Sequence, residues 1–147
     1  MKRPLLRKQR LKRMEKRSNG SLFNNIITVP TSYDTNFFKY WVDFLTPIHH
    51  LTKREREVFT MFLKKRWEYS QKISDPQMLE EYSLSNDIKR EVREACDLKP
   101  AHFHVIMTNL KKAKIIVNNR INPLFIPNIK ENKASFNLLL YFPLSTR

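Results

Sequence analysis

The chain has 147 residues and a net charge of +14, from 28 Lys or Arg and 14 Asp or Glu. Its single cysteine excludes an internal disulfide framework, and its single glycine excludes the phosphate loops GxxxxGK[ST] and GxGxxG, and with them a P-loop nucleotide hydrolase. Apolar residues make up 41% of the chain, which is enough for a core, and no apolar run approaches the roughly 20 residues of a membrane span.

Residues 1–21 are expected to form a basic N-terminal arm. Residues 1–17 hold nine Lys or Arg and one acid. Because like charges this close repel one another, the run favours an anionic partner, most often nucleic-acid phosphate. The alternatives are a solvated tail and a segment that binds an acidic protein surface. The arm residues that we expect to contact phosphates are Lys2, Arg3, Arg7, Lys8, Arg10, Lys12, Arg13, Lys16 and Arg17.

Residues 22–47 are expected to form an aromatic strap. Residues 22–29 favour a β-strand, and residues 35–45 have their apolar side chains at helical spacing, up to Pro47, which cannot continue a helix. The strap either packs across its own domain or docks on another protein. The side chains that we assign to protein docking are Phe37, Phe38 and Trp41.

The globular domain is expected to span residues 48–147 and to begin with a long helix. Thr52, followed three residues later by Glu55, forms a capping box ahead of an apolar run with helical spacing. A short helix is predicted next, with Asp75 as its N-cap and Pro76 at its first position.

Two further helices with a short turn between them have the spacing of a helix-turn-helix. The first covers about residues 87–96 and is capped by Ser85 or by one of the next two residues. The turn lies at residues 97–99, and Pro100 opens the second helix. This arrangement is typical of DNA-binding domains.

A β-hairpin is predicted after the last helix. Residues 115–117 are β-branched and match the first wing strand of a winged helix, residues 118–120 form a turn, and residues 136–142 form the returning strand. The excursion between the strands is too long for a tight hairpin, so we expect an enlarged wing. The predicted fold class is mainly α with a small β-hairpin, in the form of a winged helix-turn-helix-like domain.

The helix that begins at Pro100 is the candidate reader of DNA. Its apolar positions are spaced to face the core, which leaves an outer face with Asn109 and Lys112. Asparagine can bond adenine in two places, and lysine reaches guanine or phosphate. The alternative is a solvated helix face or a protein-assembly surface. The candidate nucleic-acid-binding residues of the domain are His102, Val105, Thr108, Asn109, Lys111, Lys112, Lys114 and Arg120.

The sequence offers no arrangement for catalysis or metal binding. His102 and His104 are two residues apart, so on a helix they splay by about 200° and share no face. Cys96 has no partner at the spacing of a zinc finger. We therefore expect a protein that is not an enzyme and that needs no metal and no cofactor.

The stretch from LTKREREVF to LKKAKIIVNNRINPLFIP resembles small winged-helix proteins of tailed, crAss-like bacteriophages. The capping box at Thr52, the turn at residues 98–100 and the element at residues 119–123 carry the resemblance, which covers about residues 48–142. The last element, N-x-I-N-P, is also similar to one in plasmid replication proteins with winged helices.

The resemblance implies two alternative functions in a phage. One is a DNA-binding protein of regulation, replication or packaging, located in the cytoplasm of the bacterial host. The other is a virion component, in which the winged helix is a scaffold, the strap docks on a portal, ring or capsid protein, and the arm faces packaged DNA. The expected partners are nucleic acid, DNA more than RNA, and other phage virion proteins, with no membrane. The target sequence and homo-oligomerisation stay open.

Overall fold

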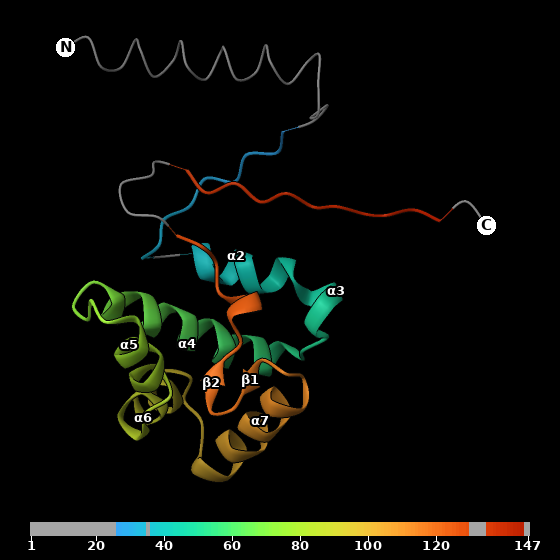
Figure 1. Cartoon of the computed structure of the whole chain (residues 1–147). Coiled ribbons are helices and arrows are strands. Elements are labelled where there is room, and N and C mark those ends of the chain that lie inside the picture. The colour runs from blue at the N-terminus through green and yellow to red at the C-terminus, as the bar shows by residue number, and fades with distance from the viewer. Residues whose placement is uncertain (1–25, 35, 130–134, 146–147) are drawn as a thin grey trace, which may run out of the picture. The chain divides into compact units, whose positions relative to one another are not determined.

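The computed structural model of the chain describes residues 26–34, 36–129 and 135–145 (Figure 1). Residues 1–25 lie outside the described part, and with them the nine Lys and Arg residues of the arm that we expect to bind phosphate. Nothing in the structure therefore bears on that expectation.

The chain divides into two units, residues 1–31 and residues 32–147. Residues 26–31, the described part of the first unit, form neither a helix nor a strand, so the strand expected in residues 22–29 does not form from residue 26 onward. Every described helix and strand lies in the second unit. This unit begins before residue 48, the expected start of the globular domain, because the helix of the aromatic strap contributes to its core.

The central element of the second unit is helix α4, Lys53–Ser70. It begins at the predicted capping box. The Thr52 hydroxyl accepts a hydrogen bond from the Glu55 backbone N–H at 3.4 Å, and the Glu55 carboxylate accepts one from the Thr52 N–H at 3.0 Å. Two of the four backbone N–H groups that a helix start leaves without partners are satisfied in this way. The apolar side chains that α4 buries are Val58, Phe59, Phe62 and Leu63.

The aromatic strap forms helix α2, Phe37–Phe44, and the short helix α3, Thr46–His49. Helix α2 packs on α4 through an apolar face that includes Phe38 and Val42, both almost fully buried. It ends before Pro47, as expected. Pro47 then lies in the first turn of α3, where its missing N–H costs no helical hydrogen bond.

Three more helices follow α4 along the chain: α5, Pro76–Ser83; α6, Asn86–Ala95; and α7, Pro100–Lys112. Asp75 and Ser85 cap α5 and α6 with their side-chain oxygens, as predicted. All three helices pack on α4, which lies between them and α2 (Figure 1). The predicted helix-turn-helix spacing therefore corresponds to α6, a short turn and α7.

A two-stranded antiparallel sheet follows α7. Strand β1, Ile116–Val117, pairs with strand β2, Arg120–Ile121. Asn118 and Asn119 form the turn between them, with φ angles of 53° and 57°. These are left-handed conformations, which a two-residue type I′ hairpin requires and which asparagine tolerates better than most residues.

The prediction of an enlarged wing with a returning strand at residues 136–142 is wrong. Those residues form no strand, and the returning strand is β2. The two asparagines reverse the chain directly after β1, which places Ile121 back in the core with 1% of its surface exposed. A 3-10 helix, η1, Pro123–Phe125, then continues along the domain.

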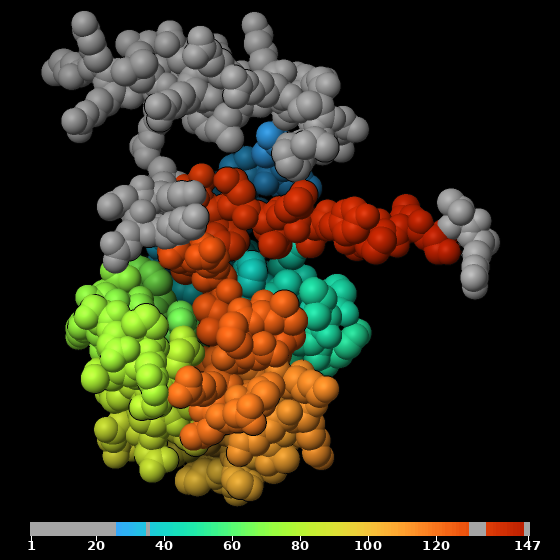
Figure 2. Space-filling model, in the orientation of Figure 1, coloured from blue at the N-terminus to red at the C-terminus, as the bar shows by residue number. Residues whose placement is uncertain are grey.

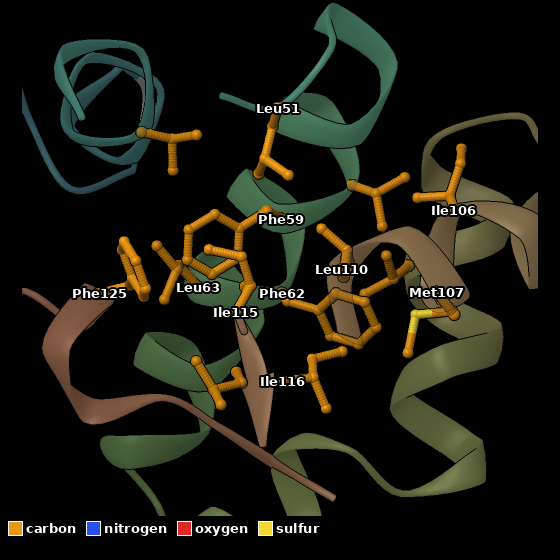
Figure 3. Packing of buried hydrophobic residues seen from close by; sticks show 14 of the residues in the cluster. Leu51, Phe59, Phe62, Leu63, Ile106, Met107, Leu110, Ile115, Ile116 and Phe125 are labelled. Carbon is orange, nitrogen blue, oxygen red and sulfur yellow. The ribbon is translucent and has the colours of Figure 1, made fainter. Parts of the chain in front are cut away.

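The core surrounds α4 and receives side chains from α2, α6, α7 and the hairpin (Figure 3). Phe59 and Phe62 of α4, Leu110 of α7, and Ile115 just before β1 have at most 1% of their surface exposed. The unit is therefore mainly helical, with one small antiparallel sheet attached to its core by buried isoleucines.

Candidate nucleic-acid interface

Positive charge is distributed unevenly over the folded part of the chain. Residues 98–130 contain six Lys or Arg and no acid, whereas the rest of residues 18–147 contains thirteen of each. In the structure, residues 98–129 of this stretch contain α7, the hairpin and η1. Helix α7 contacts β1, and β1 pairs with β2. We call residues 98–129 the basic segment.

Elsewhere in the domain, some basic side chains pair with acids. In α4, Arg54 Nη1 lies 2.6 Å from Glu57 Oε2, and Arg66 Nε lies 3.1 Å from Glu80 Oε1 of α5. Others, such as Lys53 and Lys89, have no carboxylate within 4.0 Å among the described residues, and the lysines of the basic segment share this property, so their ammonium groups remain available to phosphate. Among the described residues, no carboxylate oxygen lies within 4.0 Å of the side-chain nitrogens of Lys99, Lys111, Lys112 and Lys114.

Helix α7 exposes most of the side chains that the sequence nominated. Thr108 is partly exposed, and its hydroxyl donates to the His104 carbonyl one turn earlier at 3.1 Å. The lysines lie in the last turn of α7, where cations also stabilise the negative end of the helix dipole. The nominated residues of α7 that are exposed are His102, Val105, Lys111 and Lys112.

Asn109 does not face outward as predicted. Its side-chain Nδ2 donates to Glu55 Oε2 at 3.1 Å, and Asn109 is only partly exposed. Glu55 is buried, with 8% of its surface exposed, and needs this donor for its second oxygen. Asn109 thus joins α7 to the start of α4, and its amide nitrogen is not free to read a base.

The hairpin adds exposed polar groups to the basic segment. Lys114 lies between α7 and β1 and is exposed, as are Asn118 and Asn119 at the turn. Arg120 Nη2 lies 3.5 Å from Glu81 Oε1, with both side chains about half exposed. A surface pair of this kind contributes at most about 1 kcal/mol, so Arg120 can exchange Glu81 for a phosphate. The sequence analysis did not select the two asparagines or Lys99, although the absence of acids from residues 98–130 was a signal.

The three aromatic residues assigned to protein docking lie in the core of their own domain. Phe37 and Phe38 are buried, with 8% and 3% of their surfaces exposed. Trp41 is partly buried, and its Nε1 donates to the Phe125 carbonyl at 2.8 Å. Of the two alternatives for the strap, the structure has its helix α2 pack across its own domain.

A groove of about 680 Å³ separates the hairpin and the loop after η1 from α4 and α5. In Figure 2 the orange residues of the hairpin and its following loop lie beside the green residues of α5. The ion pair of Arg66 and Glu80 lines one side, and Arg120 and Asn118 line the other. The groove contains no nucleophile with an adjacent base, and nothing in its lining assigns it a reaction.

His49 and Cys96 lie in surroundings that give them structural roles. His49 is buried; its Nδ1 accepts from the Leu51 N–H at 3.0 Å, so Nε2 carries the proton and donates to the Val42 carbonyl at 2.8 Å. Burial lowers the pKa of His49, against the opposing effect of its hydrogen bond to Val42. Burial raises the pKa of the Cys96 thiol, which disfavours a nucleophilic thiolate. No three His, Cys, Asp or Glu residues of the described chain come together as a metal site.

Comparison with protein-family models, with curated proteins and with solved structures finds no match. Among the helices of the described residues, none has the length and apolar character needed to cross a membrane. A proposal about function therefore depends on the charge and geometry of the basic segment, and on the arm sequence.

Proposed function

We propose that this chain is a non-catalytic nucleic-acid-binding protein, with DNA as the preferred nucleic acid. One observation carries the proposal: the whole positive excess of residues 18–147 falls in residues 98–130, and four lysines there have no acidic partner in the described structure. In this proposal α6 and α7 act as a winged helix-turn-helix. Helix α7 is the reader, the hairpin is the wing, and the arm binds phosphate without regard to sequence.

The proposed binding is electrostatic in the main. Lys111, Lys112 and Lys114 neutralise phosphates beside α7, and the arm supplies up to nine further cations. If arm and basic segment together neutralise about six to ten phosphates, affinity falls by about 10³–10⁵ between about 50 and 200 mM salt. Sequence preference has to come from the exposed outer face of α7, which includes His102 and Val105.

The proposed setting is a tailed bacteriophage, with the protein in the host cytoplasm, and its support is the sequence resemblance of residues 48–142. The second candidate is a virion assembly protein that uses the same domain as a scaffold. The exposure of Val105, at 55%, is the observation that supports this candidate, because exposed apolar side chains mark protein-docking surfaces.

The test is fluorescence anisotropy with labelled duplex DNA, duplex RNA and single strands of several sequences. The proteins are the full chain and a full-length variant with the nine Lys and Arg of the arm changed to Gln. We expect the variant to bind duplex DNA more weakly and to keep a preference among sequences. Binding that depends entirely on the arm and is indifferent to sequence would favour the virion scaffold instead.

A further inference from the structure

Residues 135–145 form neither a helix nor a strand, run as an extended segment (Figure 1), and are mostly apolar and uncharged. We call them the C-terminal segment. Monomeric soluble proteins rarely leave a contiguous apolar surface of this kind in water unless a partner covers it. Six large apolar side chains of the segment have between 43% and 86% of their surfaces exposed: Leu138, Leu139, Leu140, Tyr141, Phe142 and Leu144.

The segment is attached to the domain at its beginning. The ring of Phe136 is partly buried and lies edge-on to two rings of α2, with centroids 5.1 Å from Phe37 and 5.6 Å from Trp41. Phe136 therefore fixes where the segment starts. The exposed side chains all follow this anchor, so a partner could cover them without disturbing the core.

The backbone of the segment also lacks partners in the described structure. Residues 136–142 include three aromatic residues, a type enriched in strands, yet none of the backbone hydrogen bonds among the described residues involves residues 136–142. The only described sheet consists of two strands of two residues each, joined by a tight turn. A strand forms only when another strand satisfies its N–H and C=O groups, and the described part of this chain offers none.

We propose that residues 137–142 of two copies of this chain pair as antiparallel strands and form a dimer. A second copy supplies a strand of the same composition. Around a two-fold axis, the backbone N–H and C=O groups of each strand form hydrogen bonds with those of the other. Each copy carries a charge of +14, so repulsion is weakest where two uncharged segments meet. A two-stranded ribbon is marginal alone. The ribbon therefore needs an apolar surface to pack on. Helix α2, which anchors Phe136, offers one through Tyr40 and Phe44, which are 44% and 51% exposed.

Sedimentation velocity of the nuclease-treated full chain tests the dimer. We expect twice the monomer mass of 17.8 kDa, and association that strengthens as salt rises, because salt screens the repulsion between the copies. Binding to contaminating nucleic acid would weaken with salt instead. A chain that stays monomeric at all salt concentrations would overturn the proposal, whether or not it binds nucleic acid.

Two full-length variants test the pairing. Leu139→Pro with Tyr141→Pro keeps apolar surface but removes backbone donors, and we expect the dimer dissociation constant to rise at least tenfold. The control, Leu124→Ser, removes an apolar side chain that is 74% exposed outside the segment and should leave the dimer unchanged. A dimer that survives the proline substitutions, or a dimer that Leu124→Ser weakens equally, would overturn strand pairing. Circular dichroism confirms that each variant keeps its helices.

Discussion

Glu55 and Asn109 connect the beginning of α4 to the third turn of α7. Glu55 Oε2 accepts from Asn109 Nδ2 at 3.1 Å, while Glu55 Oε1 accepts from the Thr52 N–H at 3.0 Å. Both oxygens of a buried carboxylate are thereby satisfied, one by its own capping box and one by a residue 54 positions away. The position of the proposed reading helix thus depends on a cap in another helix.

Replacing Asn109 with Ala is expected to lower the free energy of unfolding by about 1–3 kcal/mol, because it leaves one oxygen of buried Glu55 without a donor. Urea denaturation measures the change. Thr108→Ala is the control, since its hydroxyl bonds only within α7, and it should change stability by less than about 0.5 kcal/mol. Equal effects of the two substitutions would show that the bond to Glu55 contributes nothing.

Stability should decrease as the pH falls below 6.5, the ordinary pKa of a histidine. Burial lowers the pKa of His49, so the unfolded chain binds a proton that the folded chain does not. The free energy of unfolding is therefore highest above pH 6.5 and decreases on acidification toward the folded-state pKa.

Urea midpoints measured across this pH range test the effect of His49. In His49→Gln the amide can both donate and accept, so the variant should fold and lose this part of the pH dependence. His50→Asn is the control, because His50 is exposed and asparagine tolerates its left-handed φ of 53°. A pH dependence unchanged in His49→Gln would contradict the assignment.

Lys114→Gly should separate stability from binding. Lys114 has a φ of 59°, a left-handed conformation that costs a residue with a Cβ about 1–2 kcal/mol. Glycine avoids this cost, so we expect the free energy of unfolding to rise by about 1 kcal/mol while DNA binding weakens through the lost charge. Lys112→Gly, within the last turn of α7, should lower both the free energy of unfolding and the affinity for DNA. A Lys114→Gly variant that binds DNA as well as the parent chain would exclude Lys114 from the interface.

The salt dependence of binding should identify the lysines that meet phosphate. Replacing Lys111 and Lys112 with Ser should weaken binding to all sequences alike and reduce the slope of log affinity against log salt by about 2. Lys53→Ser, which removes one charge, is the control, because Lys53 is exposed on α4, outside the basic segment. Its slope should stay close to that of the parent chain. A larger effect at Lys53 would place the interface on α4.

The helices were predictable because their signals are local. The capping box of Thr52 and Glu55, the Asp75 and Ser85 caps and the proline at position 100 each depend on a few neighbouring residues, and each occurs as expected. The hairpin was misread because two consecutive asparagines in left-handed conformations close it without glycine. The apolar run at residues 136–142 has the sequence pattern of a returning strand, but it has no strand to pair with in the described chain.

The candidate site was predictable only in outline. Helical spacing selected the exposed His102, Val105, Lys111 and Lys112 correctly as outward positions of α7. It failed at Asn109, because the partner of its amide, Glu55, lies 54 residues away in the sequence, and no local pattern reports such a contact. Packing of helix α2 of the aromatic strap on its own domain likewise depends on tertiary contacts, and the sequence left it open whether the strap packs there or on another protein.

Duplex binding by the arm-neutralised full chain at low salt, measured by anisotropy, tests the central claim most directly. The comparison is between this protein with and without the substitutions Lys111→Ser, Lys112→Ser and Lys114→Ser. We expect saturable binding when the three lysines are present and its loss when they are removed. No binding in either case, or equal binding in both, would contradict the claim that the basic segment is a nucleic-acid interface.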